Sequence, residues 1–417
     1  MRKTLKPKDY FIRSFKLLPI SAALVYAILA YTNDFSFNVR RLPIGDLSRS
    51  LVLTAAATQM FTNYTEVDWE KVSEMSQEAI SISPLNSKAL TLYGLSLEGR
   101  GDSAGGRQII SAAARMNTRD NIAHYWMALD RIAIQDWPAA IDQIDILLRV
   151  QPQLWPRFYE ILLIIASTPS SLDALSEKLS EMPPWRAQFI TYLTWQSERG
   201  LRVGTSIAAR LRSRGSTFTK SEFGLLLTAL IDANRPVEGY FLWLSSLSDL
   251  QMEQLEYLSN GRFEAGISGL PFDWQISDSS GFIADITNIG EEHALWIQLY
   301  RGRPDKWIVR KLLVLPAGTF EMKGDFRANR VKTYPGFAWT ISCVGIDSRV
   351  IGETSPIEGT VPWSTFSFDF SVPQQNCSAQ WLTLTVGEPD SDFEKANGGE
   401  AWFNNLSISQ RDTPYIQ

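Results

Sequence analysis

Apolar residues between about positions 49 and 263 recur every three to four residues, which is the spacing of one face of an α-helix. Residues that interrupt helices punctuate this pattern, at Pro169, Pro183-Pro184, Gly200, Gly215 and Pro236. The dipeptide Asn260-Gly261 ends it. The pattern therefore predicts a run of short, packed helices over residues 49–263.

A repeat is visible inside this helical stretch. Pro84 and Pro152 lie 68 residues apart, which is twice 34. Three windows align at that period, 53–86, 87–120 and 121–154. The repeated positions of the middle window are Leu90, Tyr93, Gly94, Leu97, Gly106, Ile110 and Ala113. Small residues at such positions let two helices cross closely, so each window is predicted to form a helix–turn–helix unit.

The 34-residue period and the Leu-Gly spacing resemble tetratricopeptide repeats. The match is degenerate, since Thr118 stands where the closing proline is expected and Ser76 where a large apolar residue is expected. The resemblance implies an α-solenoid over 49–263, clearest over 53–154, that binds a protein partner rather than performing chemistry. The alternative is a generic helical bundle whose period arises by chance.

Beyond residue 265 the pattern changes to short alternating runs separated by glycine, proline and asparagine. The predicted strands are 272–276, 282–286, 295–300, 309–315, 319–326, 337–344, 365–371, 381–386 and 401–408. Two long loops, 345–362 and 387–399, interrupt them. Many short strands with turn residues between them predict an antiparallel β-sandwich or jelly roll over residues 265–410.

The end of this region, Gln380-Trp381-Leu382-Thr383-Leu384 through Ala401-Trp402-Phe403-Asn404-Asn405-Leu406-Ser407-Ile408, resembles the last two strands of family 4/9-type carbohydrate-binding modules. The opening Phe272-Asp273-Trp274-Gln275-Ile276 fits the same jelly roll. The resemblance covers roughly 265–410 and implies contact with a saccharide. Together with the repeats and the N-terminal segment described below, the chain is similar to envelope proteins of bacterial polysaccharide assembly.

Strand alternation separates core aromatics from those that could bind a sugar, since successive side chains point to opposite faces. Trp339 shares a face with apolar residues, and Trp402 has the parity of Leu406 and Ile408, so both are predicted to be core. Aromatic rings that face outward can stack on sugar rings. The carbohydrate-binding candidates are Trp296, Tyr300 and Trp381. The alternative is that their face packs against the helical domain or a partner protein.

A basic N-terminus precedes an apolar run. Residues 1–16 carry Arg2, Lys3, Lys6, Lys8, Arg13 and Lys16, and the apolar run covers 17–31. The preferred interpretation is a basic cytoplasmic tail at 1–16 and an uncleaved membrane anchor at 17–37. It places the chain in a bacterial inner membrane as a single-pass protein with its bulk in the periplasm. A cleaved signal and an amphipathic first helix of a soluble protein are the alternatives.

Charge and cysteine content agree with export. The net charge is −5, with 40 basic and 45 acidic residues, which makes nucleic acid a poor candidate partner. The two cysteines, Cys343 and Cys377, both lie in the predicted sandwich and could close a disulfide. Two buried free thiols are the alternative.

Sequence signals for catalysis are weak. The chain has two histidines and lacks nucleophile-elbow, zinc-protease, P-loop and Rossmann motifs, so no catalytic residue and no cofactor are predicted. The acidic loop residues Glu388, Asp390, Asp392 and Glu394 are weak calcium candidates, and a solvated loop is the preferred interpretation.

These features together predict a non-catalytic, membrane-anchored scaffold of the cell envelope in exopolysaccharide or surface polysaccharide assembly or export. Its solenoid would bind a protein and its sandwich would bind or contact a saccharide. One rival function is a purely structural assembly subunit with no ligand on the sandwich. The second rival is a polysaccharide-modifying hydrolase, whose carboxylate pair leaves no local motif.

Overall fold

The computed structural model describes residues 50–51, 53–58, 67–152, 155–278, 281–300, 307–333, 335–345, 348–387 and 398–411. The predicted basic tail, the predicted membrane anchor and the four acidic residues of the 387–399 loop lie outside these residues. Within the described part of the chain, no helix has the length and apolar character needed to cross a membrane.

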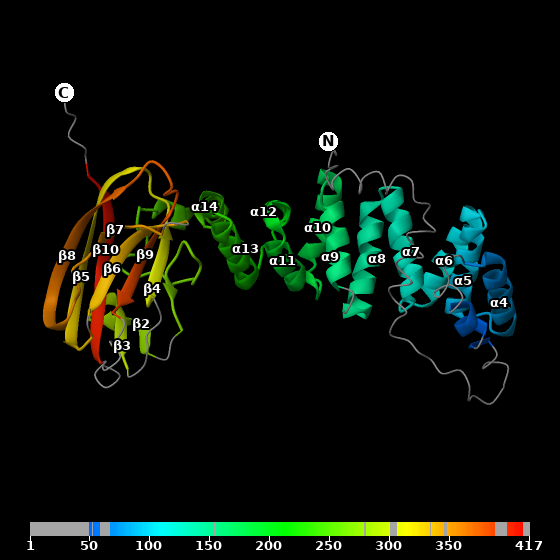
Figure 1. Cartoon of the computed structure of the whole chain (residues 1–417), viewed down its shortest axis with the longest axis horizontal. Coiled ribbons are helices and arrows are strands. Elements are labelled where there is room, and N and C mark those ends of the chain that lie inside the picture. The colour runs from blue at the N-terminus through cyan, green and yellow to red at the C-terminus, as the bar shows by residue number, and fades with distance from the viewer. Residues whose placement is uncertain are drawn as a thin grey trace, which may run out of the picture. The chain divides into compact units, whose positions relative to one another are not determined.

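Helices form the first part of the described chain and strands the last part, in the predicted order (Figure 1). The helices are α4 (Trp69–Ile82), α5 (Ser87–Gly99), α6 (Ser103–Met116), α7 (Asn121–Ala133), α8 (Trp137–Val150), α9 (Trp155–Ile165), α10 (Pro169–Ser180), α11 (Arg186–Trp195), α12 (Ser197–Ser213), α13 (Lys220–Asp232), α14 (Pro236–Leu244) and α15 (Asp249–Glu253).

The 34-residue period recurs in the residues that begin the helices. Asp68, Asp102 and Asp136 are the N-caps of α4, α6 and α8 and are spaced 34 residues apart. Each carboxylate accepts a hydrogen bond from the backbone N–H three residues later, at 3.1, 2.9 and 3.4 Å. Such caps satisfy N–H groups that have no partner within the helix. Helix starts are thus fixed at the spacing that the apolar pattern predicted.

Glycines permit the close crossing of α5 and α6. A Cβ at Gly106 would lie 2.7 Å from the carbonyl oxygen of Gly94, and a Cβ at Gly94 would lie 2.6 Å from Ile110. Any larger residue would push the two axes apart. The apolar side chains next to this crossing, Leu95, Ile110 and Trp126, are buried in one cluster.

The chain divides into two compact units. The first comprises residues 1–192 and 206–217, and the second comprises 193–205 and 218–417. The predicted boundary between helical domain and sandwich, near residue 264, lies inside the second unit. The reason is that α13 and α14 share an apolar cluster with the sandwich, through Leu227, Trp243, Phe272 and Leu312.

The strands of the second unit form two antiparallel sheets. They are β1 (Gln275–Ile276), β2 (Phe282–Ile289), β3 (Glu292–Leu299), β4 (Val309–Leu313), β5 (Gly318–Val331), β6 (Phe337–Cys343), β7 (Val350–Glu353), β8 (Gly359–Val372), β9 (Gln380–Val386) and β10 (Gly399–Gln410). Sheet A has the order β1-β4-β9-β6-β7, and sheet B has the order β2-β3-β10-β5-β8. One large apolar cluster draws buried residues from both sheets, including Trp339, Leu384 and Phe403. The predicted antiparallel sandwich is confirmed.

Part of the predicted loop 345–362 is strand. The four residues of β7 pair with β6, and β8 begins at Gly359, earlier than predicted. Strand β7 is too short to show alternation, which is why the pattern missed it. Gly352 lets β7 lie against sheet B, since a Cβ there would be 2.6 Å from Cβ of Phe370.

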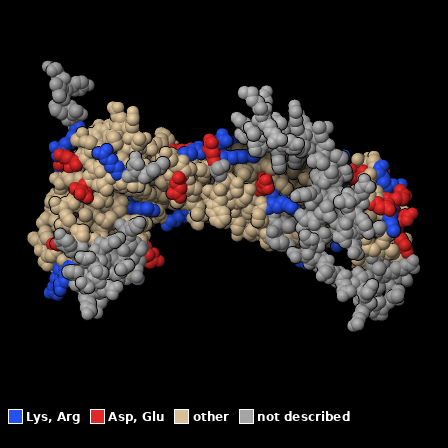
Figure 2. All heavy atoms as spheres, viewed as in Figure 1, with Lys and Arg blue, Asp and Glu red and all other residues tan. Residues whose placement is uncertain are grey.

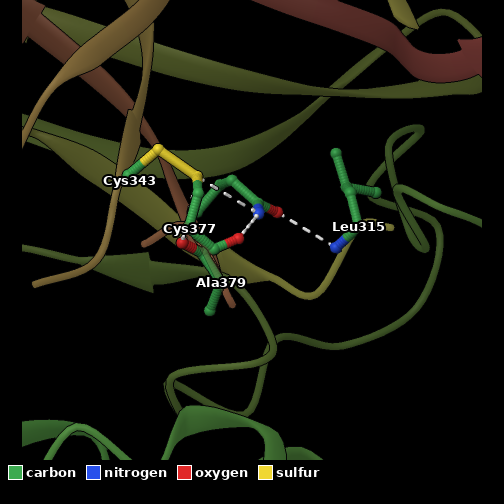
Figure 3. Close-up of a disulfide and its surroundings, with 5 residues drawn as sticks. Leu315, Cys343, Cys377 and Ala379 are labelled. Atoms are coloured by element: carbon green, nitrogen blue, oxygen red, sulfur yellow. Dashed lines mark hydrogen bonds between the residues drawn. A yellow bond between two sulfur atoms is a disulfide. The ribbon is translucent and has the colours of Figure 1, made fainter. Parts of the chain in front are cut away.

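The predicted disulfide is confirmed. Cys343 ends β6 and Cys377 precedes β9, and their sulfurs are bonded (Figure 3). The amide of Gln380 reinforces this corner, donating to the carbonyl of Cys377 and accepting from the backbone N–H of Leu315, at 2.9 and 3.0 Å. The bridge therefore joins a strand end and a loop at one end of sheet A.

Candidate functional site

The outer face of sheet B carries two aromatic side chains beside each other. On β3, Leu295, Ile297 and Leu299 are buried in the core, so Trp296 turns to the opposite face. Trp296 lies directly across from Trp402 of β10 in the strand register. Both rings are partly exposed. Side chains directly opposite each other on neighbouring strands have Cβ atoms about 4.5–5.5 Å apart, so the two indoles are neighbours on one face.

The prediction that Trp402 is core is wrong, and the cause is a β-bulge. The register of β10 against β5 shifts between Asn404 and Ser407, and Asn405 has φ 53°. The extra residue changes the parity of the strand, so that Ala401 and Phe403 before it, and Leu406 and Ile408 after it, all face the core. Asparagine tolerates positive φ, so the Asn404-Asn405 pair was the one available sequence signal.

Polar groups hold the two tryptophans in place. The indole N–H of Trp296 donates to Glu400 at 3.1 Å, and the amide of Asn329 donates to the other oxygen of Glu400 at 3.2 Å. The guanidinium of Arg327 lies 5.1 Å from the ring centroid of Trp402. Asp285 is the register neighbour of Trp296 on the other side. The aromatic pair is therefore flanked by fixed charges.

A groove of about 430 Å³ lies next to this pair on the same sheet. It is lined by Ile289, Glu292, Ala294, Asp325, Trp363, Ser364, Thr365, Asn404 and Asn405. Trp363 is 41% exposed. Ala294 and Asn404 are each two residues from the tryptophan of their strand, at the next outward place on β3 and β10. We name this set of lining residues the outer-face groove.

Hydrogen bonds fix the polar side chains of the outer-face groove. Asp325 accepts from the hydroxyl of Thr365 at 2.8 Å and from the amide of Asn405 at 2.9 Å. The buried amide of Asn404 donates to Glu292 at 3.1 Å. Two carboxylates, two amides and an exposed indole thus converge from β3, β5, β8 and β10. Sequence reasoning missed all of these groove residues, since no local motif links them.

The structure does not bring the three sequence candidates together. Trp296 belongs to sheet B, beside the outer-face groove, and Trp381 belongs to sheet A. Tyr300 follows β3 and is 39% exposed, with its hydroxyl 3.0 Å from the side-chain oxygen of Gln298. A single sugar-binding face cannot contain Trp296 and Trp381 at once.

Trp381 lies beneath helices of the second unit. It packs against the apolar cluster of α13, α14 and sheet A. The guanidinium of Arg310 lies 4.2 Å from the centroid of Trp381 and 4.2 Å from that of Trp307. Burial lowers the pKa of Arg310, while the nearby carboxylate of Asp232 opposes that change. Trp381 thus occupies the covered position that the sequence left open as an alternative.

A buried lysine holds the segment before the sandwich. The ammonium of Lys311, on β4, donates to the carbonyl and the hydroxyl of Ser259 at 2.7 and 3.0 Å. It also lies 5.3 Å from the ring of Trp274. Burial lowers the pKa of Lys311 to about 8, and Asp273 opposes the shift. The ammonium of Lys311 thus bonds Ser259 to sheet A and is not part of the outer-face groove.

Charge is distributed rather than gathered over the face of the molecule shown in Figure 2. Basic and acidic side chains alternate there without a large patch of one sign. Over the residues that the structure describes, no group of three or more His, Cys, Asp or Glu side chains is placed to hold a metal ion.

No protein-family model matches the chain, and no curated protein matches it. Among solved structures, the chain is similar to a family 4 carbohydrate-binding module, with 16% identity, a TM-score of 0.29 and coverage of 37% of this chain and 99% of that chain. It is similar to a family 61 module in complex with β-1,4-galactotriose, with 17% identity, a TM-score of 0.26 and coverage of 38% and 99%. It is also similar to Family 16 Carbohydrate Binding Module-2, with 13% identity, a TM-score of 0.27 and coverage of 37% of this chain and 100% of that chain. TM-scores this low assign neither a family nor a ligand to this chain. The assignment of a sandwich fold rests on the order of the strands in its two sheets.

Proposed function

We propose that the protein is a non-catalytic saccharide-binding protein and that the outer-face groove, with the Trp296–Trp402 pair beside it, is its binding site. The observation that carries the proposal is this aromatic pair next to a groove with a 41% exposed Trp363. Flat rings contact the C–H faces of sugars, and such contacts retain a ligand without any reaction.

The polar residues of the outer-face groove supply the rest of the recognition. Hydroxyl groups of a saccharide would donate to Glu292 and Asp325 and would exchange hydrogen bonds with the amide of Asn405. These side chains are already held by protein partners, so little side-chain freedom remains to be lost on binding. The groove is therefore arranged for orientation as well as contact.

A glycan array with the full chain tests this proposal. We expect retention of one group of glycans, and loss of that retention in Trp363→Ala and Trp402→Ala. Trp195→Ala is the matched control, because Trp195 is an equally large exposed ring, 83% exposed, on a helix. No binding to any glycan by the folded wild-type protein would refute the proposal. It would favour the structural subunit without a ligand.

We propose that the helical part is a degenerate tetratricopeptide-like solenoid that binds a protein partner. The capping period of 34 residues supports the repeat assignment. A groove within the second unit supports the partner: its lining includes the exposed Trp195 and Leu225, together with the small residues Gly224 and Ala229. A pull-down from envelope extract should retain a partner with the wild type and lose it with Trp195→Ala and Leu225→Asp.

The cellular setting that we propose is the bacterial envelope, with residues 17–37 as anchor and the bulk of the chain in the periplasm, in surface polysaccharide assembly or export. Support comes from the basic residues before the apolar run and from the disulfide. Fractionation of cells that produce the tagged full chain tests the location. Turnover of a purified polysaccharide that disappears in Glu292→Gln or Asp325→Asn would establish the rival hydrolase instead.

A further inference from the structure

The two ends of the outer face of sheet B differ in how their carboxylates are paired. Glu292 and Asp325 line the outer-face groove, and Asp285 and Glu400 flank Trp296 on the same face. Their hydrogen-bond partners are all neutral: a backbone N–H for Asp285, amides for Glu292 and Asp325, a hydroxyl for Asp325, and an indole and an amide for Glu400. Among the described residues, none of these four carboxylates has an ion pair with a cation.

Toward the start of β5, the carboxylates on the same face are paired with cations. Glu321 is paired with Lys323 at 2.8 Å and with Arg411 at 3.0 Å, and Asp369 is paired with Arg411 at 2.8 Å. Asp325 and Glu321 lie on the same strand β5, so the difference is not one of exposure of the sheet alone. Over the residues that the structure describes, the two carboxylates that line the outer-face groove thus have no cation partner, whereas Glu321 and Asp369 have theirs.

A metal ion does not account for this excess. No set of three or more acidic, histidine or cysteine side chains in the described ranges is disposed to hold one. The carboxylates Glu292 and Asp325 instead line a groove that also contains the exposed ring of Trp363. A ligand that fits this combination has a ring face for the indole and a positive charge for the carboxylates.

We propose that the outer-face groove selects saccharides that carry free amino groups, such as de-N-acetylated hexosamine polymers. This proposal rests on the saccharide-binding function proposed above and specifies its ligand class. An ammonium group on the sugar donates charge-assisted hydrogen bonds to Glu292 or Asp325, which a hydroxyl or an acetamide matches less well. The sugar ring meanwhile contacts Trp363.

Calorimetric titration of the full chain tests the selection with three matched probes: a glucosamine oligosaccharide, its fully N-acetylated counterpart of the same length, and a cello-oligosaccharide of that length. We expect the free amine form to bind at least about tenfold more tightly, which corresponds to about 1.4 kcal/mol. The preference should shrink as salt is raised, because salt screens exposed charges.

Variants assign the preference to the groove. Glu292→Gln and Asp325→Asn each keep side-chain size, and each should weaken binding of the amine form several-fold more than it weakens binding of the acetylated form. Asp369→Asn is the matched control, since Asp369 lies on the same sheet but at the internally paired end. Thermal melting of each variant checks that loss of binding does not reflect loss of the fold.

Each outcome decides the matter. Equal or tighter binding of the acetylated or neutral oligosaccharide overturns the selection while leaving the saccharide-binding function in place. Absence of binding to all three probes, together with an empty glycan array, removes both proposals. A lysine oligopeptide of the same charge is the last probe: if it binds as tightly as the glucosamine oligosaccharide, the groove responds to charge alone and the selection for amino sugars is refuted.

Discussion

The outer faces of the two sheets have similar sequence patterns and opposite surroundings. Each pairs an outward tryptophan with an arginine: Trp402 with Arg327 on sheet B, and Trp381 with Arg310 on sheet A. On sheet B the pair borders the open outer-face groove. On sheet A it lies beside the cluster that α13 and α14 form with Phe272 and Leu312. Strand alternation tells which side chains leave the core, and it does not tell whether another layer covers them.

Sheet A also shows that a covered face can reverse the usual polarity of a strand. On β4, Leu312 joins the cluster with the helices, while its neighbour Lys311 is buried and bonded to Ser259. An apolar residue is tolerated on the outer side because helices remove it from water. The charged residue is tolerated on the inner side because its ammonium finds two oxygen acceptors.

The strongest test of the comparison removes the cover of sheet A. Phe272→Ala should cost about 3–5 kcal/mol, because the ring is 1% exposed and the cavity left behind cannot fill. Trp363→Ala on sheet B should change stability by about 0.5 kcal/mol or less, since Trp363 is 41% exposed. Urea unfolding followed by circular dichroism measures both. Similar losses for the two variants would contradict the distinction between covered and open faces.

The disulfide belongs to sheet A alone, and its removal should affect stability but not binding. Cys343 and Cys377 are separated by 34 residues, so the paired change Cys343→Ser and Cys377→Ser should cost about 3–4 kcal/mol in the loop-entropy view. Differential scanning calorimetry gives the loss. Glycan retention below the new melting temperature should equal that of the wild type. A selective loss of retention in the folded variant would show that the two sheets are coupled.

Lys311 should make stability rise with pH between about 8 and 10. Burial lowers its pKa to about 8 in the folded protein, whereas an unfolded lysine titrates near 10.4. Between these values the unfolded chain binds more protons than the folded one, so the free energy of unfolding increases with pH, by about 1–3 kcal/mol in total. Below about pH 8 the contribution is constant. Urea midpoints at several pH values measure the slope, which Lys311→Met should flatten. An unchanged slope would show that Lys311 stays charged.

The smallest expected effect compares the two arginines directly. Arg310→Ala should cost about 2 kcal/mol, because its guanidinium lies between two rings on the covered face. Arg327→Ala should cost about 0.5–1 kcal/mol, because its ring contact is open to water. Thermal melts at matched salt concentration compare the two. The reverse order would mean that cover by helices adds nothing to this contact.

Local features of the chain were predictable, and the meeting of distant parts was not. Apolar spacing predicted the helices, alternation predicted the buried faces of β3, β6 and β9, and the cysteine count predicted the disulfide. The outer-face groove joins residues far apart in sequence, such as Glu292 and Asn404, which are separated by 112 residues. The spacing of apolar residues does not predict a contact between residues so far apart in sequence. The sequence left the cover over Trp381 open as an alternative, because it depends on where α13 packs.

The bulge in β10 has a consequence for how the strand tolerates change in length. Loss of Asn405 would leave Ala401, Phe403, Leu406 and Ile408 in strict alternation, so the core alone has no need of the additional residue. What would vanish is the amide that Asn405 donates to Asp325 in the outer-face groove. A shorter β10 is thus compatible with the sandwich core, and the inserted asparagine matters for the proposed binding site rather than for the fold.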